Sequence, residues 1–199
     1  MSNPDEEGLR AEEQLLSRAQ AGDQDALETI FNKYRNQVFS LAYRMTGNAA
    51  DAEDLTQEVF LQVMRKIGSF QGRSSFSTWL YRVTVNRARD YMRTKKRSPE
   101  LLSQDGDGAE PHEMLYATSN SPQPESSAIA SEAQRLVQQA LMDLPMNLRA
   151  PLVLHELEGL EYRVVASMLR LPVGTVKSRI FRGRVKLAEI LETHKEQWR

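Results

Sequence analysis

The sequence predicts an all-α protein built from two small helical domains that an acidic, flexible linker joins. Three observations carry this prediction. Apolar residues recur at three- and four-residue steps over most of the chain, helix-forming residues dominate, and prolines, glycines and acids gather in one central stretch. The length of 199 residues suits one large or two small domains.

The charges divide the chain into three segments. Residues 1–97 carry 15 basic and 13 acidic residues, and residues 126–199 carry 11 basic and eight acidic residues. Residues 98–125 carry six acids and no base, together with four of the eight prolines. Few large apolar residues remain there to offset the entropy of ordering that stretch. We therefore predict domains at 1–97 and 126–199, with 98–125 as a flexible linker whose coil spans on the order of 30 Å.

Four helices are predicted in the first domain from apolar spacing and end signals. The first ends near Gly22, and the second ends at Gly47 and Asn48 because both residue types tolerate the left-handed cap conformation. A loop at 68–74 precedes the fourth. The expected helices cover 9–21, 25–45, 49–67 and 75–96.

The third predicted helix begins with acids, and two interpretations of them stay open. Asp51, Glu53 and Asp54 suit the positive end of a helix dipole. Asp54, Gln57 and Glu58 also fall on one exposed face, as a docking surface for another protein would.

The fourth predicted helix carries a basic stripe. Arg82, Asn86, Arg89 and Arg93 stand at i, i+4, i+7 and i+11 and therefore share one face. Between residues 86 and 97, six basic residues stand against one acid. Such a stripe attracts phosphate, and an amide among arginines can hydrogen-bond a base edge. The plainer alternative is a basic helix end that complements the dipole.

The second domain ends in a helix-turn-helix pattern. Helices are expected at 128–142, with Val137 on the apolar side, around 152–157, at 161–169 and from 173 into the tail. The last two are joined by a tight turn, and residues 170–186 carry six bases and no acid. One side of the last helix offers donors, a hydroxyl and the ring of Phe181 for phosphate, base-edge and thymine-methyl contacts. A surface that only confers solubility is the alternative.

Several classes of protein are excluded by what the chain lacks. It has no cysteine, so thiolate metal sites and thiol catalysis are absent, and its three histidines match no metal spacing. No phosphate loop or nucleophile motif is present. Apolar runs are too short for membrane insertion, and the charged start is unlike a signal peptide. We expect a cytoplasmic protein that is not an enzyme and holds no cofactor and no metal.

Two sets of motifs resemble bacterial sigma factors. Asp51-Ala-Glu-Asp-Leu-Thr-Gln-Glu-Val-Phe60, Ser75-Phe-Ser-Thr-Trp-Leu-Tyr-Arg82 and Asn86-Arg-Ala-Arg-Asp-Tyr-Met-Arg93 resemble region 2. Leu144-Pro145, Leu157-Glu-Gly-Leu160 and Pro172-Val-Gly-Thr-Val-Lys-Ser-Arg-Ile-Phe-Arg182 resemble region 4. With region 3 absent, the chain resembles an extracytoplasmic-function (ECF) sigma factor of the RpoE-like type over nearly its whole length, except residues 1–8 and the linker.

The resemblance implies a factor that binds core RNA polymerase, through its β′ coiled coil and β subunit, and directs transcription from promoter DNA. It also implies control by an anti-sigma factor, which holds the chain at the inner membrane where that regulator is membrane-bound. The residues implied for polymerase binding are Asp51, Asp54, Gln57 and Glu58. Those implied for the minus-ten element are Ser69, Phe70, Arg73, Arg82, Asn86, Arg89 and Arg93. Those implied for the minus-thirty-five element are Thr175, Lys177, Ser178, Arg179, Phe181 and Arg182.

Three positions depart from the family pattern. Arg163-Val164 stand where the family usually has a Glu pair, and Pro151 lies where the family continues a helix, which it would kink beyond the first turn. Arg170 takes a turn position where Gly is common, so we expect either a distorted turn or an added phosphate contact.

Two other function classes compete with this interpretation. An autonomous repressor or activator on the same helix-turn-helix would bind specific duplex DNA tightly without polymerase. A nucleic-acid-processing enzyme would show divalent-dependent cleavage by the pure chain, although the sequence offers no metal-ligand cluster for it.

Overall fold

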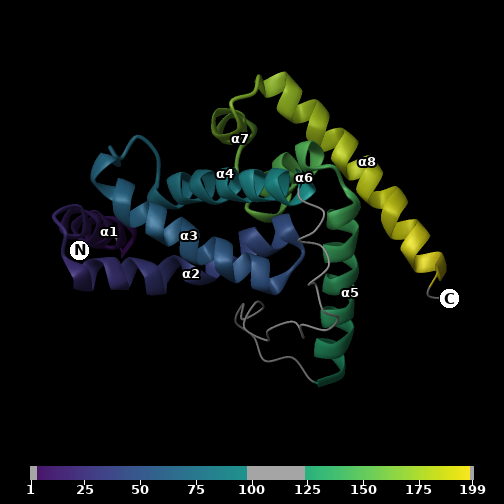
Figure 1. Ribbon diagram of the computed structural model, residues 1–199, viewed down its shortest axis with the longest axis horizontal. Helices are drawn as coiled ribbons and strands as arrows, with labels where there is room; N and C mark the ends of the chain where they lie inside the picture. The colour runs from purple at the N-terminus through teal and green to yellow at the C-terminus, as the bar shows by residue number, and fades with distance from the viewer. Residues whose placement is uncertain (1–3, 98–123, 198–199) are drawn as a thin grey trace.

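Helices account for the regular structure in the part of the chain that the structure describes, residues 4–97 and 124–197 of a computed structural model (Figure 1). The first body contains α1 (Pro4–Gln20), α2 (Gln24–Thr46), α3 (Ala49–Lys66), the 3₁₀ turn η1 (Ile67–Ser69) and α4 (Phe76–Arg97). The second body contains α5 (Pro124–Asp143), α6 (Met146–Leu152), the π-helical segment η4 (Val153–Leu157), α7 (Tyr162–Leu169) and α8 (Val173–Gln197). The all-α fold class and the two helical domains are confirmed. The linker expected at 98–125 lies outside the described residues except for its last two positions, which begin α5.

Side-chain and glycine caps set the junction between α2 and α3. Asp23 opens α2 by accepting a hydrogen bond from the Ala26 backbone N–H at 3.2 Å. Gly47 ends it with a φ of 76°, a left-handed conformation that costs glycine little. Asn48 then caps α3 by accepting from the Asp51 backbone N–H at 3.0 Å. The predicted stop at these two residues is confirmed, because the signals are local.

An aromatic cluster fixes the loop between α3 and α4. Phe70 packs against Phe76 and Trp79, with both ring centroids 5.6 Å from its own. Gln20 of α1 donates its side-chain amide to the carbonyls of Ile67 and Phe70 at 3.1 and 2.8 Å. The loop that follows α3 is therefore held from two sides.

The second body accommodates both unusual backbone positions. Pro151 lies inside α6, where it can donate no backbone hydrogen bond, and the chain stays helical by widening into η4. Arg170 ends α7 at φ 55° and ψ 49°, and its N–H bonds to the Ala166 carbonyl as a glycine cap would. The turn is therefore regular, at a strain of about 1 kcal/mol for a side chain in this region.

One expectation about α5 is wrong. Val137 is 37% exposed, whereas its neighbour Gln138 is buried. The Gln138 amide donates to the Tyr43 carbonyl of α2 at 2.9 Å. The buried face of α5 is thus set by α2, a partner that the spacing within α5 does not reveal.

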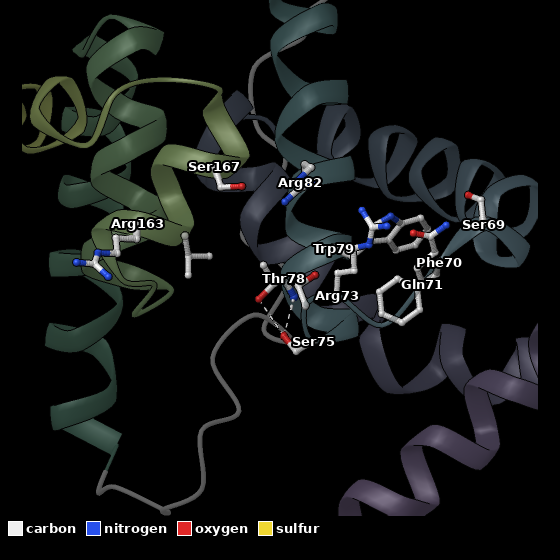
Figure 2. Close-up of a pocket in the computed structure, with 12 residues that line it drawn as sticks. Ser69, Phe70, Gln71, Arg73, Ser75, Thr78, Trp79, Arg82, Arg163 and Ser167 are labelled. Carbon is white, nitrogen blue, oxygen red and sulfur yellow. Dashed lines mark hydrogen bonds between the residues drawn. The ribbon is translucent and has the colours of Figure 1, made fainter.

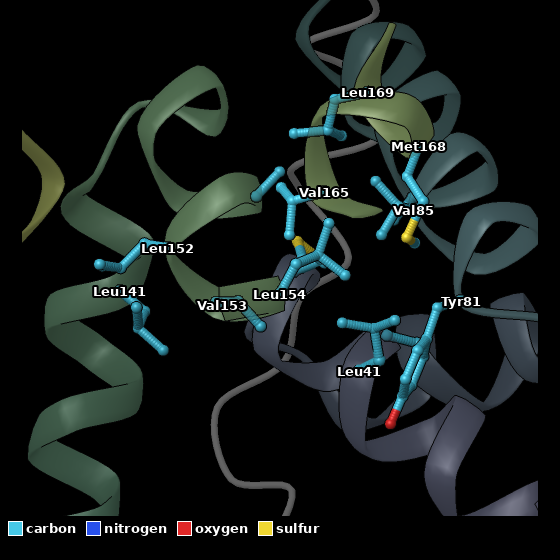
Figure 3. Packing of buried hydrophobic residues seen from close by; sticks show 14 of the residues in the cluster. Leu41, Tyr81, Val85, Leu141, Leu152, Val153, Leu154, Val165, Met168 and Leu169 are labelled. Carbon is cyan, nitrogen blue, oxygen red and sulfur yellow. The ribbon is translucent and has the colours of Figure 1, made fainter. Parts of the chain in front are cut away.

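The two bodies share one apolar core. Leu41, Met45 and Val85 of the first body belong to the same buried cluster as Leu154 and Met168 of the second (Figure 3). Figure 3 shows Met168 of α7 beside Val85 of α4, and Leu154 facing α2. A second cluster, internal to the first body, surrounds Ile30 and Phe76. We call the surface along which the bodies meet the seam.

Buried polar groups join the bodies across the seam. Arg149, only 4% exposed, donates from its guanidinium to the Met45 carbonyl of α2 and to the Met142 and Leu144 carbonyls of its own body. Glu158 follows η4 and pairs with Arg44 of α2. The Glu158 side chain is 7% exposed and that of Arg44 is 33% exposed, so the carboxylate of this ion pair is desolvated while the guanidinium keeps contact with water.

Candidate polymerase and promoter interfaces

The outer face of α3 combines acids with exposed apolar residues. Asp54 and Gln57 are exposed, and Leu61 and Met64 continue the same stripe with 48% of their surface exposed each. Glu58 lies on this face too but pairs with Arg87 of α4. Exposed leucine and methionine beside acids are typical of a surface that docks on another protein.

Asp51 is separated from that face by its partners. Its carboxylate binds the Lys95 ammonium at 3.1 Å, and both side chains are about one-sixth exposed. It also accepts a hydrogen bond from the Tyr91 hydroxyl; burial and this bond raise the pKa of Tyr91 to about 12. The carboxylate therefore joins α3 to α4, and the dipole interpretation fits it better than docking does.

The minus-ten candidates line the first of three cavities along the seam. This cavity, about 700 Å³, is bounded by Ser69, Phe70, Arg73 and Arg82 on one wall and by α7 on the other. Figure 2 shows the Ser167 hydroxyl of α7 directed toward Arg82, while the guanidinium of Arg163 points away from the loop. The structure thus brings the loop candidates and Arg82 together.

Arg82 has an unusual environment within this wall. Its Nε is buried without a hydrogen-bond partner. A buried donor without an acceptor is costly, by about 1–3 kcal/mol, and therefore favours an anionic or carbonyl ligand at that position.

The other α4 candidates continue along the seam. Asn86, Arg89 and Arg93 line a second cavity of about 410 Å³, whose far wall carries Arg170. Arg93 also pairs with Asp90 at 3.2 Å. The predicted shared face of α4 is confirmed: Asn86, Arg89 and Arg93 border α7 across this cavity while their side chains stay exposed.

A third cavity brings residues of both candidate DNA surfaces together. Arg89 of α4 and Arg179 of α8 both line this space of about 230 Å³. Among the residues whose side chains the structure describes, 8–95 and 133–193, none forms an ion pair with Arg89, Arg170 or Arg179. Unpaired cations from both bodies therefore approach one another along the seam.

The exposed side of α8 carries the remaining minus-thirty-five candidates. Phe181 is 65% exposed, and Arg182 is exposed beside it. The Ser178 hydroxyl donates to the Thr175 carbonyl at 3.0 Å, and Lys177 lies over the Tyr162 ring at 5.5 Å. Apolar residues of the opposite side, Val176 and Ile180, are fully buried as expected.

Sequence reasoning missed the residues that position the two surfaces. Arg149 and Glu158 were not singled out, although both are buried at the seam. A signal existed for Arg149, which lies three and four residues before buried Leu152 and Val153 and hence on their helix face. Nothing local marks Glu158.

Two absences hold for the part of the chain that the structure describes. None of its helices is long and apolar enough to cross a membrane. No three of its acidic and histidine side chains lie close enough to hold a metal ion.

The arrangement of a helix-turn-helix body with a second helical body that carries a basic face defines a DNA-binding transcription protein. Residues 30–98 match the family model "Sigma-70 region 2", and residues 134–187 match "Sigma-70, region 4". The chain is 36% identical over 181 residues to the RNA polymerase sigma-H factor of Pseudomonas aeruginosa, covering 91% of this chain and 94% of that one. It is 38% identical over 170 residues to the ECF RNA polymerase sigma-E factor of Escherichia coli K12, covering 85% and 88%.

Two solved structures share the fold. RpoE of Bartonella quintana, crystallised with the anti-sigma factor NepR, is 24% identical with a TM-score of 0.60, covering 83% of this chain and 96% of that one. CnrH in complex with the cytosolic domain of CnrY is 23% identical with a TM-score of 0.60, covering 90% and 96%. The chain belongs to the sigma-70 family of RNA polymerase sigma factors, in its ECF group. It therefore works with core RNA polymerase in promoter-specific initiation, which decides against an autonomous regulator.

Proposed function

We propose that this sigma factor holds the minus-ten element on α4 and the preceding loop, holds the minus-thirty-five element on α8, and docks on polymerase through α3. The observation that carries the proposal is the placement of two cationic, hydrogen-bonding faces on different bodies, with an acidic and apolar face on the first body. The assigned boundaries are 1–97 for region 2 and 126–199 for region 4.

Capture of a melted base is the role proposed for the first cavity. Phe70 and Trp79 are partly exposed rings on which a base can stack, and base–aromatic stacking contributes about 1–3 kcal/mol per base. The unpartnered Nε of Arg82 supplies a donor for a base carbonyl or a phosphate. Asn86, exposed one turn further along α4, offers both a donor and an acceptor to a base edge.

Duplex recognition is the role proposed for α8. Phe181 can contact a thymine methyl group, and Arg182 can bind a guanine edge with two hydrogen bonds. Thr175 and Arg179, which are less exposed, suit backbone phosphates.

Docking on the β′ coiled coil is proposed for the outer face of α3. Asp54 and Gln57 provide the polar contacts, and Leu61 and Met64 provide apolar area at the centre. Glu58 contributes if its pair with Arg87 opens, whereas Asp51 supports the face from within.

An anti-sigma factor is the proposed regulator, supported by the related fold of RpoE from Bartonella quintana, which was solved in complex with the anti-sigma factor NepR. On this proposal the chain is cytoplasmic and is held at the inner membrane only through its regulator. The chain contributes no catalysis of its own, so metal-dependent cleavage of DNA by the pure protein would contradict this part.

Run-off transcription with core polymerase, with and without the chain, tests the proposal. We expect specific transcripts only when both are present. Arg182→Ala should lose discrimination at one base of the upstream element, by about 1–3 kcal/mol, while Arg135→Ala on exposed α5 serves as the matched control. Uniform weakening on all sequences would assign Arg182 to phosphate instead. Asn86→Ala is compared with the wild type on promoters that are altered at each base of the minus-ten element in turn. If the variant transcribes from all of them as the wild type does, the role of Asn86 in base capture is wrong.

A further inference from the structure

The observed arrangement places the two proposed DNA surfaces too close together for a promoter. Arg89 and Arg179 line the same cavity of about 230 Å³. The elements that they would contact lie about 25 base pairs apart by their names, which is roughly 85 Å of duplex at about 3.4 Å per base pair. One chain in this arrangement cannot occupy both elements, so the bodies must separate first.

Specific contacts oppose that separation. Leaving the seam would expose Leu41, Met45 and Val85 to water. It would also break the bond from Arg149 to the Met45 carbonyl and leave Glu158 without Arg44. The Tyr81 hydroxyl also donates to Glu158, so this carboxylate binds two side chains of the first body.

Other charges favour separation. Arg89 of α4 lines cavities together with Arg170 and Arg179 of the second body, and no acid pairs with any of the three among residues 8–95 and 133–193, although Asp90 lines the cavity of Arg170. Like charges across an interface repel, and water in the cavities weakens this effect without removing it. The closed arrangement is thus held, against cationic repulsion, by apolar contact and by one ion pair whose carboxylate is buried.

We propose that the seam is an autoinhibitory contact, and that the Arg44–Glu158 pair is its latch. In the closed chain α7 forms the far wall of the cavities that the minus-ten face lines, and opening removes that wall and frees α8 to move away. Because the argument uses the assigned DNA surfaces, it rests on the proposed function. The latch residues themselves belong to none of the proposed DNA or polymerase contacts.

A charge swap in the full chain provides the test. The native chain has no cysteine, so Asn32→Cys and Ala188→Cys on exposed positions of α2 and α8 allow two dyes to report the distance between the bodies. Glu158→Lys should shift the closed-to-open ratio at least tenfold toward open, and Arg44→Glu added to it should restore closure. Glu156→Lys is the matched control, because it makes the same charge change in an exposed pair with Arg184 inside the second body.

Transcription separates this inference from the proposed function. At limiting polymerase, Glu158→Lys should reach half-maximal specific transcription at a several-fold lower concentration than the wild type, and the double variant should return to the wild-type value. Thermal unfolding of each variant identifies a loss of folding, which the double variant should reverse. If Glu158→Lys stays closed, or opens without any gain in transcription, the autoinhibitory contact is wrong. If the wild type directs no specific transcription, the proposed function fails while the dye measurement still decides closure.

Discussion

Replacing Arg149 with methionine tests how much of the fold depends on one buried cation. The guanidinium donates to three backbone carbonyls at the junction of α5, α6 and the end of α2. Methionine has a similar length and no donor, so Arg149→Met removes these bonds with little change in volume. Arg135→Met, on the exposed side of α5, is the control for loss of a cation alone.

The magnitude follows from the number and place of the acceptors. Each carbonyl left without a partner costs about 1–3 kcal/mol when buried. Two acceptors, the carbonyls of Met142 and Leu144, lie in the second body, so we expect it to lose about 3 kcal/mol of unfolding free energy. Burial lowers the pKa of Arg149, which shows that its desolvation already offsets part of the gain and favours the low end of the range.

The third acceptor belongs to the other body. The Met45 carbonyl lies across the seam, and its loss should shift closure by about 1.4 kcal/mol, or roughly tenfold. Urea unfolding monitored by circular dichroism measures the first effect, and the paired dyes measure the second. A loss below about 1 kcal/mol for Arg149→Met, or an equal loss for Arg135→Met, would refute the reasoning.

Three further perturbations address the seam and the α3 face. Gly47→Ala should cost about 2 kcal/mol in urea unfolding, since φ is 76° and the new Cβ would overlap the Met142 sulfur. Adding Met142→Ala should relieve only the steric part, so full recovery would contradict the strain. Burial, followed by the bond to Glu158, raises the pKa of Tyr81 to about 12. The contribution of the Tyr81 hydroxyl to the free energy of unfolding is complete below about pH 10 and is lost as pH rises toward 12. The stability difference between the wild type and Tyr81→Phe should therefore shrink over this pH range. A constant difference would argue against the raised pKa. The double variant Asp54→Ala with Gln57→Ala should weaken binding to core polymerase about tenfold in titration. Glu53→Ala is the control and should not weaken it, because the Glu53 carboxylate pairs with Arg35 inside the first body. Unchanged affinity in the double variant would favour the dipole interpretation of the acids.

Local signals predicted the helices well. Asp23, Gly47 and Asn48 act on backbone groups within four residues of themselves, so sequence spacing contains all the information their caps need. The shared face of α4 follows from helical periodicity in the same way. Helical periodicity therefore predicted which residues of α4 share a face, while their roles in DNA binding stay predictions.

Long-range partners could not be predicted. Gln138, Arg149 and Glu158 bind residues 95, 104 and 114 positions away, respectively. From the spacing within α5, Gln138 is expected at the surface and Val137 in the core. The structure shows the opposite, because the Gln138 side chain is buried and donates to the Tyr43 carbonyl. A polar side chain is buried only where it finds a hydrogen-bond partner, and the sequence around it does not reveal a partner far away in the chain.

Arg170 shows why the seam and the DNA surfaces use the same cations. Its positive φ would carry no strain in a glycine, so keeping an arginine there costs about 1 kcal/mol. In the closed chain Arg170 lines the cavity that Arg89, Arg93 and Asp90 also line, where its repulsion from the two arginines is offset only in part by the single carboxylate. On the proposed function, the same charge in an open chain on a promoter would lie at the turn of the helix-turn-helix, where a phosphate contact would help to fix the position of the recognition helix. On the proposed function, the Arg170 charge is therefore more favourable on DNA than in the closed state, so this charge, and not the backbone strain that both states share, biases the chain toward opening when phosphate is available.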